Sequence, residues 1–159
     1  MERYFYSRFD NRVDKKGRVS VPARWRAILA AQSLDGIVAY PSPVSPAIEA
    51  CGMDRLERLA ESIDTFNPFS DAHGDFAAAL LTRSHPLAFD SEGRVMLPKS
   101  LLDHAGIGEL AAFAGRGATF QIWEPGAYAS YEQEAIRRAR EEAPRFALMR
   151  EPGGEGEAT

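Results

Sequence analysis

The 159-residue sequence is poor in the features that mark secreted and membrane proteins. It has one cysteine, Cys51, so no disulfide can form within the chain, which excludes a disulfide-stapled secreted module. The longest apolar run, Phe76–Leu81, has six residues, whereas a bilayer span needs about 20. Charged residues near the N-terminus, Glu2, Arg3 and Arg8, stand where a signal peptide needs an apolar core. These absences predict a soluble cytoplasmic protein made of one ordinary domain or two small ones.

Positive charge is concentrated near the N-terminus of an acidic chain. The net charge is −4, yet the segment Arg8–Arg26 holds seven basic and two acidic residues, a net charge of +5, which leaves −9 for the rest. A basic cluster on an otherwise acidic chain is typical of a surface that faces nucleic-acid phosphates. The segment therefore predicts DNA binding through its basic residues, which are Arg8, Arg12, Lys15, Lys16, Arg18, Arg24 and Arg26.

The chain contains an internal repeat. Asp14–Pro22, with the sequence DKKGRVSVP, recurs 76 residues later as Asp90–Pro98, with the sequence DSEGRVMLP. Five of the nine positions are identical, and a helical stretch follows the proline in both copies. We interpret the chain as two copies of one unit, each too small to bury a large core by itself.

Each copy predicts a strand, a turn, a second strand and a helix. Asp at the first position and Gly at the fourth position of Asp14–Gly17 and Asp90–Gly93 are the preferences of a type I turn. Polar and apolar residues alternate after the turn, which directs Val19 and Val21 toward a core and Arg18 toward the opposite face. The same pattern follows the second turn.

Hydrophobic spacing and helix breakers predict the remaining elements. Strands are expected at Phe9–Val13, Gly36–Tyr40, Leu87–Phe89, Leu110–Ala114 and Thr119–Trp123. Helices are expected at Ala23–Ala31, Met53–Ile63, Asp71–Arg83, Lys99–Ala105 and Gly126–Glu142. The tail, rich in glycine and glutamate, is expected to be disordered.

The repeated segments resemble a known family. Asp14–Arg26 and Asp90–Pro98 resemble the two signatures of the MraZ family, and Ala114–Gly117 followed by Phe120–Trp123 resembles its closing strand pair. The resemblance covers the chain up to about Glu142. It implies an α+β fold of two tandem AbrB/SpoVT-like swapped-hairpin β-barrel units with short helices, related by a pseudo-twofold axis.

The resemblance also implies a function and a domain plan. The function is that of a bacterial transcriptional regulator, associated with the nucleoid, that binds G-rich direct repeats in double-stranded DNA upstream of its own cell-division and cell-wall gene cluster. The family further implies a ring-shaped homo-oligomer, and we expect no cofactor, metal, small-molecule substrate or membrane partner. The plan places the two AbrB/SpoVT-like domains at residues 5–52 and 83–126, inter-repeat helices at 53–82, a C-terminal helix at 127–143 and a disordered tail at 144–159.

The family's basic signature falls on the first copy only. By the resemblance it covers Lys15, Lys16 and Arg18, with Arg24 and Arg26 on the following helix. Arg18 suits guanine, because a guanidinium can bond O6 and N7 of that base in a fork.

The second copy keeps the turn but not the charge. The structural turn residues are Asp14 and Gly17 in the first copy and Asp90, Gly93 and Arg94 in the second, where Arg94 corresponds to Arg18. The lysine pair of the first copy is replaced by Ser91-Glu92 in the second. Arg83–Leu101 therefore has a net charge of only +1. We expect Arg94 to act structurally by pairing with a carboxylate, and the second copy to serve assembly.

Other classes of protein fit the sequence less well. Against an enzyme, His73, His85, His104 and Cys51 form no metal-ligand spacing, and the sequence has no P-loop, dinucleotide fingerprint or G-x-S-x-G motif. Two alternatives stay open: an AbrB-fold antitoxin that binds a toxin and DNA, and a purely structural ring component. The antitoxin would need a long apolar C-terminal segment, and few large apolar residues follow Phe146.

Overall fold

The computed structural model describes residues 3–149, and the chain divides into two compact units, residues 1–128 and 129–159. The described strands are β1 (Arg8–Arg12), β2 (Arg18–Ser20), β3 (Gly36–Pro41), β4 (Ile48–Cys51), β5 (His85–Ala88), β6 (Arg94–Met96), β7 (Leu110–Gly115) and β8 (Phe120–Trp123). The helices of the first unit are α1 (Ala23–Ala30), α2 (Met53–Ile63), α3 (Asp71–Phe76), the π-helical turn η1 (Ala77–Leu81) and α4 (Lys99–Ala105). Helix α5 (Pro125–Glu142) begins in the first unit and continues in the second, where the 3-10 turn η2 (Ala143–Arg145) follows it.

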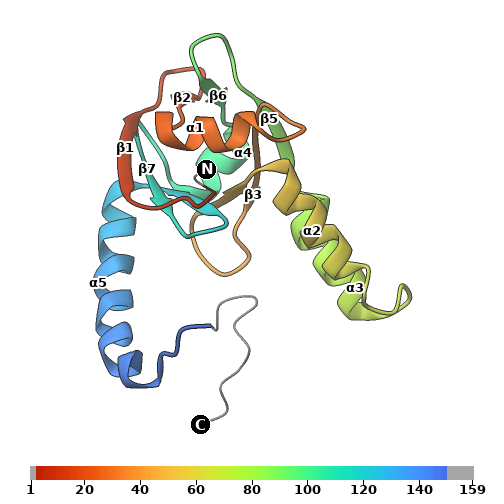
Figure 1. Ribbon diagram of the computed structural model, residues 1–159. Helices are drawn as coiled ribbons and strands as arrows, with labels where there is room; N and C mark the ends of the chain where they lie inside the picture. The colour runs from red at the N-terminus through yellow and green to blue at the C-terminus, as the bar shows by residue number, and fades with distance from the viewer. Residues whose placement is uncertain (1–2, 150–159) are drawn as a thin grey trace. The chain divides into compact units, whose positions relative to one another are not determined.

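The fold is α+β, as predicted, and its strands are antiparallel (Figure 1). Six strands form one sheet in the order β1-β7-β8-β4-β3-β5, while β2 and β6 form a separate two-stranded ribbon. β1 and β5 are the outer strands of the sheet, so within residues 3–149 the ladders do not close into a barrel, and the closed β-barrel units implied by the resemblance are not observed. Four of the six pairings join a strand of the first repeat to a strand of the second: β1 with β7, β2 with β6, β3 with β5, and β4 with β8.

This pairing scheme is unchanged when the two repeats are exchanged. Exchanging β1 with β5, β3 with β7, and β4 with β8 turns the strand order of the sheet into its own reverse. The ribbon is centred on Val19 opposite Val95, and the β4–β8 pair is centred on Glu49 opposite Gln121. At the second centre the side-chain amide of Gln121 donates to the carboxylate of Glu49. Each repeat therefore completes the sheet of the other.

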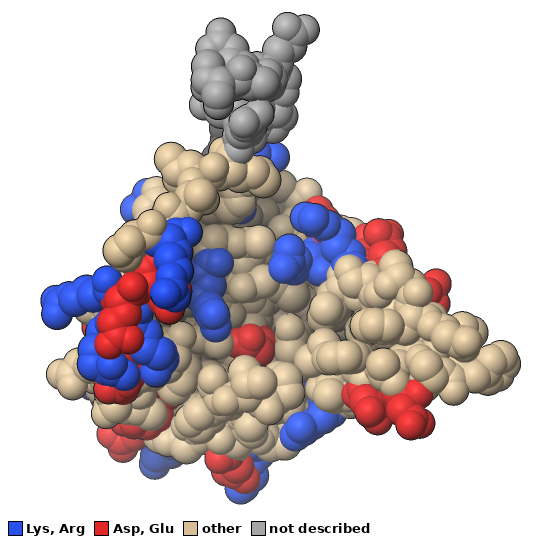
Figure 2. Space-filling view, turned by 90° about the horizontal axis from the view of Figure 1, so that it is seen from below, with Lys and Arg blue, Asp and Glu red and all other residues tan. Residues whose placement is uncertain are grey.

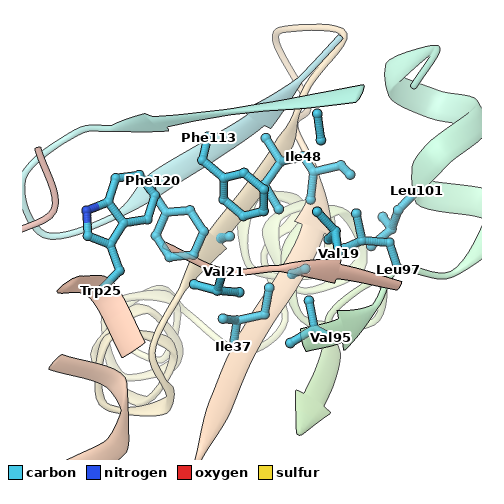
Figure 3. Close-up of a cluster of buried hydrophobic side chains, with 14 of the residues drawn as sticks. Val19, Val21, Trp25, Ile37, Ile48, Val95, Leu97, Leu101, Phe113 and Phe120 are labelled. Carbon is cyan, nitrogen blue, oxygen red and sulfur yellow. The ribbon is translucent and has the colours of Figure 1, made fainter. Parts of the chain in front are cut away.

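A single apolar core is shared by both repeats (Figure 3). Val19, Val21, Val95 and Leu97 are at most 1% exposed, which confirms the alternation predicted after both turns. Trp25 of α1 is 2% exposed and lies at the centre of an aromatic cluster. Its ring centroid is 4.8–6.2 Å from those of four phenylalanines, Phe5, Phe9, Phe113 and Phe120. Two of these four come from the second repeat, so one repeat alone cannot form this cluster.

An arm of helices separates the two repeats in the sequence. Helix α2 has the bounds predicted from its spacing, and in Figure 1 it lies beside α3. The single helix predicted for Asp71–Arg83 is instead α3 followed by η1, which ends at Leu81. The rings of Phe66 and Phe76 stack with centroids 5.7 Å apart, and Phe69 between the helices is 95% exposed.

The other predicted elements are present with bounds shifted by one or two residues, and one strand is additional. The sequence predicts no strand at Ile48–Cys51, yet this segment forms β4 between β3 and β8. Of the tail predicted to be disordered, residues 150–159 lie outside the described residues. In the part of the chain that is described, no helix combines the length and apolar character needed to cross a membrane.

The aromatic cluster yields a stability prediction. We expect Trp25→Ala to lower the free energy of unfolding by about 3–5 kcal/mol, because it removes a large buried ring and leaves a cavity among four phenylalanines. Urea denaturation followed by circular dichroism measures the change. Val44→Ala, at a position that is 87% exposed, is the control and should change stability by less than about 0.5 kcal/mol. Equal effects of the two substitutions would contradict a core centred on Trp25.

Candidate nucleic-acid interface

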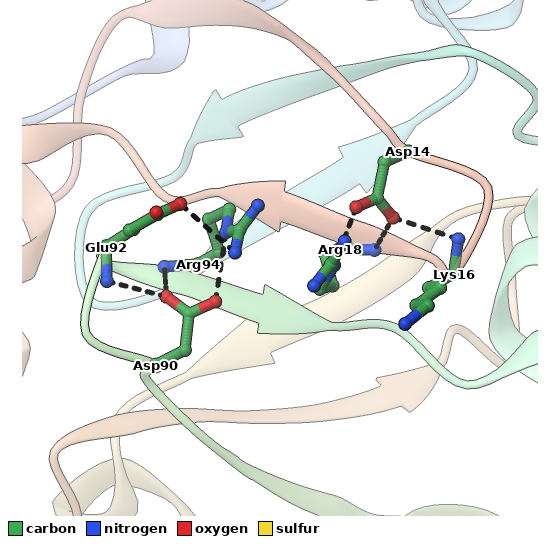
Figure 4. Close-up of polar contacts among 6 residues, drawn as sticks. All are labelled: Asp14, Lys16, Arg18, Asp90, Glu92 and Arg94. Carbon is green, nitrogen blue, oxygen red and sulfur yellow. Dashed lines mark hydrogen bonds and ion pairs between the residues drawn. The ribbon is translucent and has the colours of Figure 1, made fainter.

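One carboxylate holds the turn between β1 and β2 (Figure 4). Asp14 Oδ1 accepts the backbone N–H groups of Lys16 and Arg18 at 2.9 and 2.8 Å, and Oδ2 accepts Nε of Arg18 at 2.6 Å. The N–H of Gly17 donates to the carbonyl of Asp14 at 3.0 Å and closes the turn. Gly17 has a φ of 85°, and a Cβ there would lie 2.6 Å from a backbone carbonyl oxygen, so the turn requires glycine. This bracing leaves Lys15 and Lys16 exposed at the tip.

The turn between β5 and β6 repeats this geometry. Asp90 Oδ1 accepts the N–H groups of Glu92 and Arg94, both at 2.9 Å, and Oδ2 accepts Nε of Arg94 at 2.9 Å. The N–H of Gly93 donates to the carbonyl of Asp90 at 3.1 Å, and Gly93 has a φ of 75°. The turns predicted at both copies are therefore confirmed.

The two turns differ in the contacts made by the terminal guanidinium nitrogens of Arg18 and Arg94. Nη2 of Arg94 pairs with the carboxylate of Glu92 at 3.1 Å, so this guanidinium contacts two acids (Figure 4). Arg18 makes the same Nε contact to Asp14, but its terminal nitrogens bond to no other residue within 3–149. The expected pairing of Arg94 with a carboxylate is present. What distinguishes the copies is the second acid, together with the lysine pair beside Arg18.

The ribbon of β2 and β6 brings both arginines onto one outer face. Arg18 lies opposite Met96 and Ser20 lies opposite Arg94, on the side away from the buried valines. Two further bonds tie each turn to the other repeat. The N–H of Leu97 donates to the carbonyl of Gly17 at 2.8 Å, and the N–H of Val21 donates to the carbonyl of Gly93 at 3.3 Å.

Arg26 is partly buried, whereas Lys15 and Lys16 in the first turn are exposed. Its Nη1 donates to the carbonyl of Val21 at 3.0 Å, and its guanidinium packs over Gly93, where a Cβ would lie 2.8 Å away. Arg26 therefore braces the first helix against the turn of the second repeat.

The remaining basic residues of the segment lie at the two ends of β1 and at the start of α1. Arg24 is exposed, with its guanidinium 4.9 Å from the ring centre of Tyr6. Arg8 pairs with Asp10 at 3.0 Å. Arg12 is exposed at the end of β1 and lines a groove of about 480 Å³ together with Lys15.

The other candidate reactive groups lie elsewhere. Cys51 is buried, and burial raises the pKa of its thiol to about 12, so the sulfur stays protonated near neutral pH. Nε2 of His104, on α4, lies 3.2 Å from the carbonyl oxygen of Ser45 in the β3–β4 loop. Among the described residues, no group of three or more His, Cys, Asp or Glu side chains could hold a metal ion.

Comparisons with known proteins identify relatives over most of the chain. Residues 80–150 match the family model described as "MraZ protein, putative antitoxin-like". A protein of Rickettsia canadensis named transcriptional regulator MraZ is 46% identical over 137 residues, covering 86% of this chain and 92% of that protein. Proteins of the same name from Pelagibacter ubique and Rickettsia akari are 46% and 43% identical, covering 85% and 91% of this chain and 87% and 95% of their own lengths.

The two braced turns have a consequence for acid stability. Hydrogen bonds lower the pKa of both aspartates below the usual 3.8, and the largest cause is the backbone N–H of Arg18 at Asp14 and that of Arg94 at Asp90. A carboxyl whose pKa is lowered by folding stabilises the fold above its unfolded pKa, and this stability is lost as the pH falls through the folded pKa. We therefore expect Asp14→Asn/Asp90→Asn to be less stable than the wild type near neutral pH.

The difference should begin to shrink near pH 4, where the aspartates of the unfolded chain become protonated, and should disappear once the pH has fallen through the lower pKa values of the folded wild type. Thermal melts between pH 2.5 and pH 7 measure it. Asp71→Asn/Asp103→Asn, which alters aspartates outside the two turns, is the control and should follow the wild-type pH dependence more closely. A gap between Asp14→Asn/Asp90→Asn and the wild type that is the same at pH 3 and at pH 7 would contradict the bracing.

Proposed function

This chain belongs to the MraZ family of transcriptional regulators, and we propose that it acts by binding specific double-stranded DNA through the first turn. The observation that carries the proposal is the pair Lys15 and Lys16, exposed at the tip of a turn that Asp14 braces. Beside them Arg18 offers terminal nitrogens that bond to nothing else within residues 3–149. Donors held in place in this way lose little freedom on binding.

Each residue of the first turn has a distinct role in the proposal. Lys15 and Lys16 neutralise backbone phosphates and release counterions, which gives affinity without sequence information. Arg18 reads guanine, because the contact of its Nε with Asp14 fixes the plane of the guanidinium and leaves the terminal nitrogens for O6 and N7. The major groove admits a two-stranded ribbon, and the β2–β6 ribbon has Arg18 on its outer face.

The flanking arginines extend this surface. Arg12 is exposed beside Lys15 in one groove, and we assign it a further phosphate contact. Arg8 and Arg24 are exposed toward the start of β1, where Arg8 pairs with Asp10 and Arg24 packs on Tyr6, and in the proposal they contact phosphates farther from the turn. Arg26 supports the interface indirectly, since its guanidinium is engaged by the carbonyl of Val21 and packs over Gly93.

We further propose that the fold is a tandem pair of AbrB/SpoVT-like units, residues 5–52 and 83–126, that exchange hairpins about a pseudo-twofold axis. The pairing registers support this, because they are unchanged when the repeats are exchanged. The resemblance extends the proposal to a ring-shaped homo-oligomer on the nucleoid. That ring would bind G-rich direct repeats upstream of the chain's own cell-division and cell-wall gene cluster. The exposed aromatic rings of the arm, Phe66, Phe69 and Phe76, supply apolar surface for such assembly.

The antitoxin alternative has less support. It requires an apolar C-terminal segment that covers a toxin, and the matching family model carries the words antitoxin-like in its description. After α5 the described residues include Phe146, Leu148 and Met149 as exposed apolar side chains, a short segment for that purpose. A regulator that contacts DNA through a braced basic turn accounts for more of the observed geometry.

Removing the lysine pair tests the proposed function. We expect Lys15→Ala/Lys16→Ala to reduce the slope of log K against log salt concentration by about two, since each phosphate contact contributes about 0.9. Fluorescence anisotropy with the duplex upstream of the gene, at several salt concentrations, measures the slope. The matched control is Arg83→Ala/Lys99→Ala, which removes the same charge from the corresponding segment of the second repeat and should keep the wild-type slope. A wild-type slope in Lys15→Ala/Lys16→Ala would exclude the first turn as the DNA site.

Comparing the two braced arginines tests the division of labour between the repeats. Arg18 and Arg94 brace equivalent aspartates, so Arg18→Ala and Arg94→Ala should lower the melting temperature by similar amounts. Only Arg18→Ala should also relax the preference for operator over scrambled DNA, by about 1–3 kcal/mol if the base contact is bidentate. Anisotropy, thermal melting and light scattering on both variants measure base preference, stability and oligomer mass. If Arg94→Ala keeps its melting temperature and mass but loses DNA binding as fully as Arg18→Ala, both repeats read DNA.

A further inference from the structure

Three arginines line a hollow that lies outside the proposed DNA turn. The hollow has a volume of about 330 Å³ and forms where the N-terminal segment and α1 meet the start of α2. Arg3 contributes from the N-terminal segment, and Arg55 and Arg58 contribute from α2. On the face drawn in Figure 2, basic side chains gather where the arm of α2 and α3 joins the rest of the first unit. The volume is at the lower end of the range for small-ligand sites, which begins at about 300 Å³.

The arginines of the hollow form no ion pair with the acids of residues 3–149. Within residues 3–149 no carboxylate forms an ion pair with Arg55 or Arg58, and Asp54 is the one acid that lines the hollow. Arg55 and Arg58 are three residues apart on one helix, so both lie on the same face, where like charges repel. An anion between the two guanidiniums would remove this repulsion.

The side chain of Gln32 joins α1 to the start of α2 at the floor of the hollow. Oε1 of Gln32 accepts the N–H of Asp54 at 3.0 Å and so caps the first turn of α2. The same amide packs over Gly52, where a Cβ would lie only 2.0 Å from Oε1. Gly52 and Gln32 therefore fix the position from which Arg55 and Arg58 extend.

We propose that Arg3, Arg55 and Arg58 bind a phosphate group in this hollow. A guanidinium forms two parallel hydrogen bonds to phosphate oxygens, so three arginines from two segments can surround one group. Tyr4, which is 54% exposed, also lines the hollow, and the guanidinium of Arg3 lies over its ring, 5.6 Å from the ring centre. The phosphate belongs either to a small phosphate-bearing ligand or to the DNA backbone. In both cases the site is separate from Lys15 and Lys16.

Calorimetric titration with inorganic pyrophosphate tests the site on the full chain. We expect saturable binding by the wild type and binding at least tenfold weaker in Arg55→Ala/Arg58→Ala. Both positions are exposed on α2, so the substitutions leave the core intact, and a thermal melt checks the fold. The matched control is Arg83→Ala/Arg140→Ala, which removes the same charge from positions outside the hollow and should bind pyrophosphate like the wild type. Sodium chloride at equal ionic strength controls for general screening.

A second arm of the experiment separates the two sources of phosphate. If the DNA backbone occupies the hollow, Arg55→Ala/Arg58→Ala reduces the salt slope of DNA binding by about two. If a small ligand occupies it, pyrophosphate binding is lost while the salt slope stays at the wild-type value. The proposal is overturned if the variant binds pyrophosphate as the wild type does, or if the wild type binds none and the variant keeps the wild-type DNA slope. Pyrophosphate binding is measured without DNA, so its loss in Arg55→Ala/Arg58→Ala can be observed whether or not Lys15 and Lys16 contact DNA.

Discussion

The ribbon of β2 and β6 is the contact through which each repeat supports the other. Val19 and Val95 meet at its centre with 0% and 1% exposure. Beyond its ends, the carbonyl of each turn glycine accepts an N–H from the opposite repeat. The glycine that shapes each turn is thus also bonded across the ribbon, so each turn is held both by its own aspartate and by the opposite repeat. The shared core, the outer sheet and the position of the first turn all follow from this mutual dependence.

Patterns of residues close in the sequence predicted most of the helices, strands and turns, but they could not predict which distant strands pair. The four-residue turns, the buried alternation after them and the bounds of α2 depend on residues close in sequence, so composition and spacing suffice for them. β4 is different. Ile48–Cys51 has four residues without clear alternation, and its strand conformation is stabilised by pairing with β8, some 70 residues later. The change from the α-helical turns of α3 to the π-helical turn η1 keeps helical backbone angles at Phe76 and Ala77, so the local sequence gives no sign of it.

Some residues of the candidate sites could likewise be predicted from the sequence, and others only from the fold. The excess of lysine and arginine in Arg8–Arg26 is visible by counting, which is why Lys15 and Lys16 could be singled out. The enclosure of Arg26 depends on Gly93, which only folding brings near. Arg55 and Arg58 were missed because Asp54, Glu57 and Glu61 on the same helix cancel their charge in any sequence window. The two arginines lie in one hollow because they are three residues apart on α2 and so share a face of the helix, which the net charge of the segment does not reveal.

The two turns of this chain have the same backbone geometry but different charges, and under the proposed function this difference affects how the protein binds DNA. A twofold protein with two equivalent basic turns is suited to palindromic sites, because its symmetry matches that of the site. Here the turns have equivalent geometry, but Glu92 occupies the place of Lys16 and neutralises the outer edge of Arg94. Under the proposed function, each chain then presents one basic turn with one polarity on the DNA. Several such chains, repeated in the same orientation, would read direct repeats, and the spacing of the repeats would be set by the distance between neighbouring subunits. The charge asymmetry within one chain thus provides a physical reason for a regulator to be oligomeric, since a single basic turn supplies few phosphate contacts.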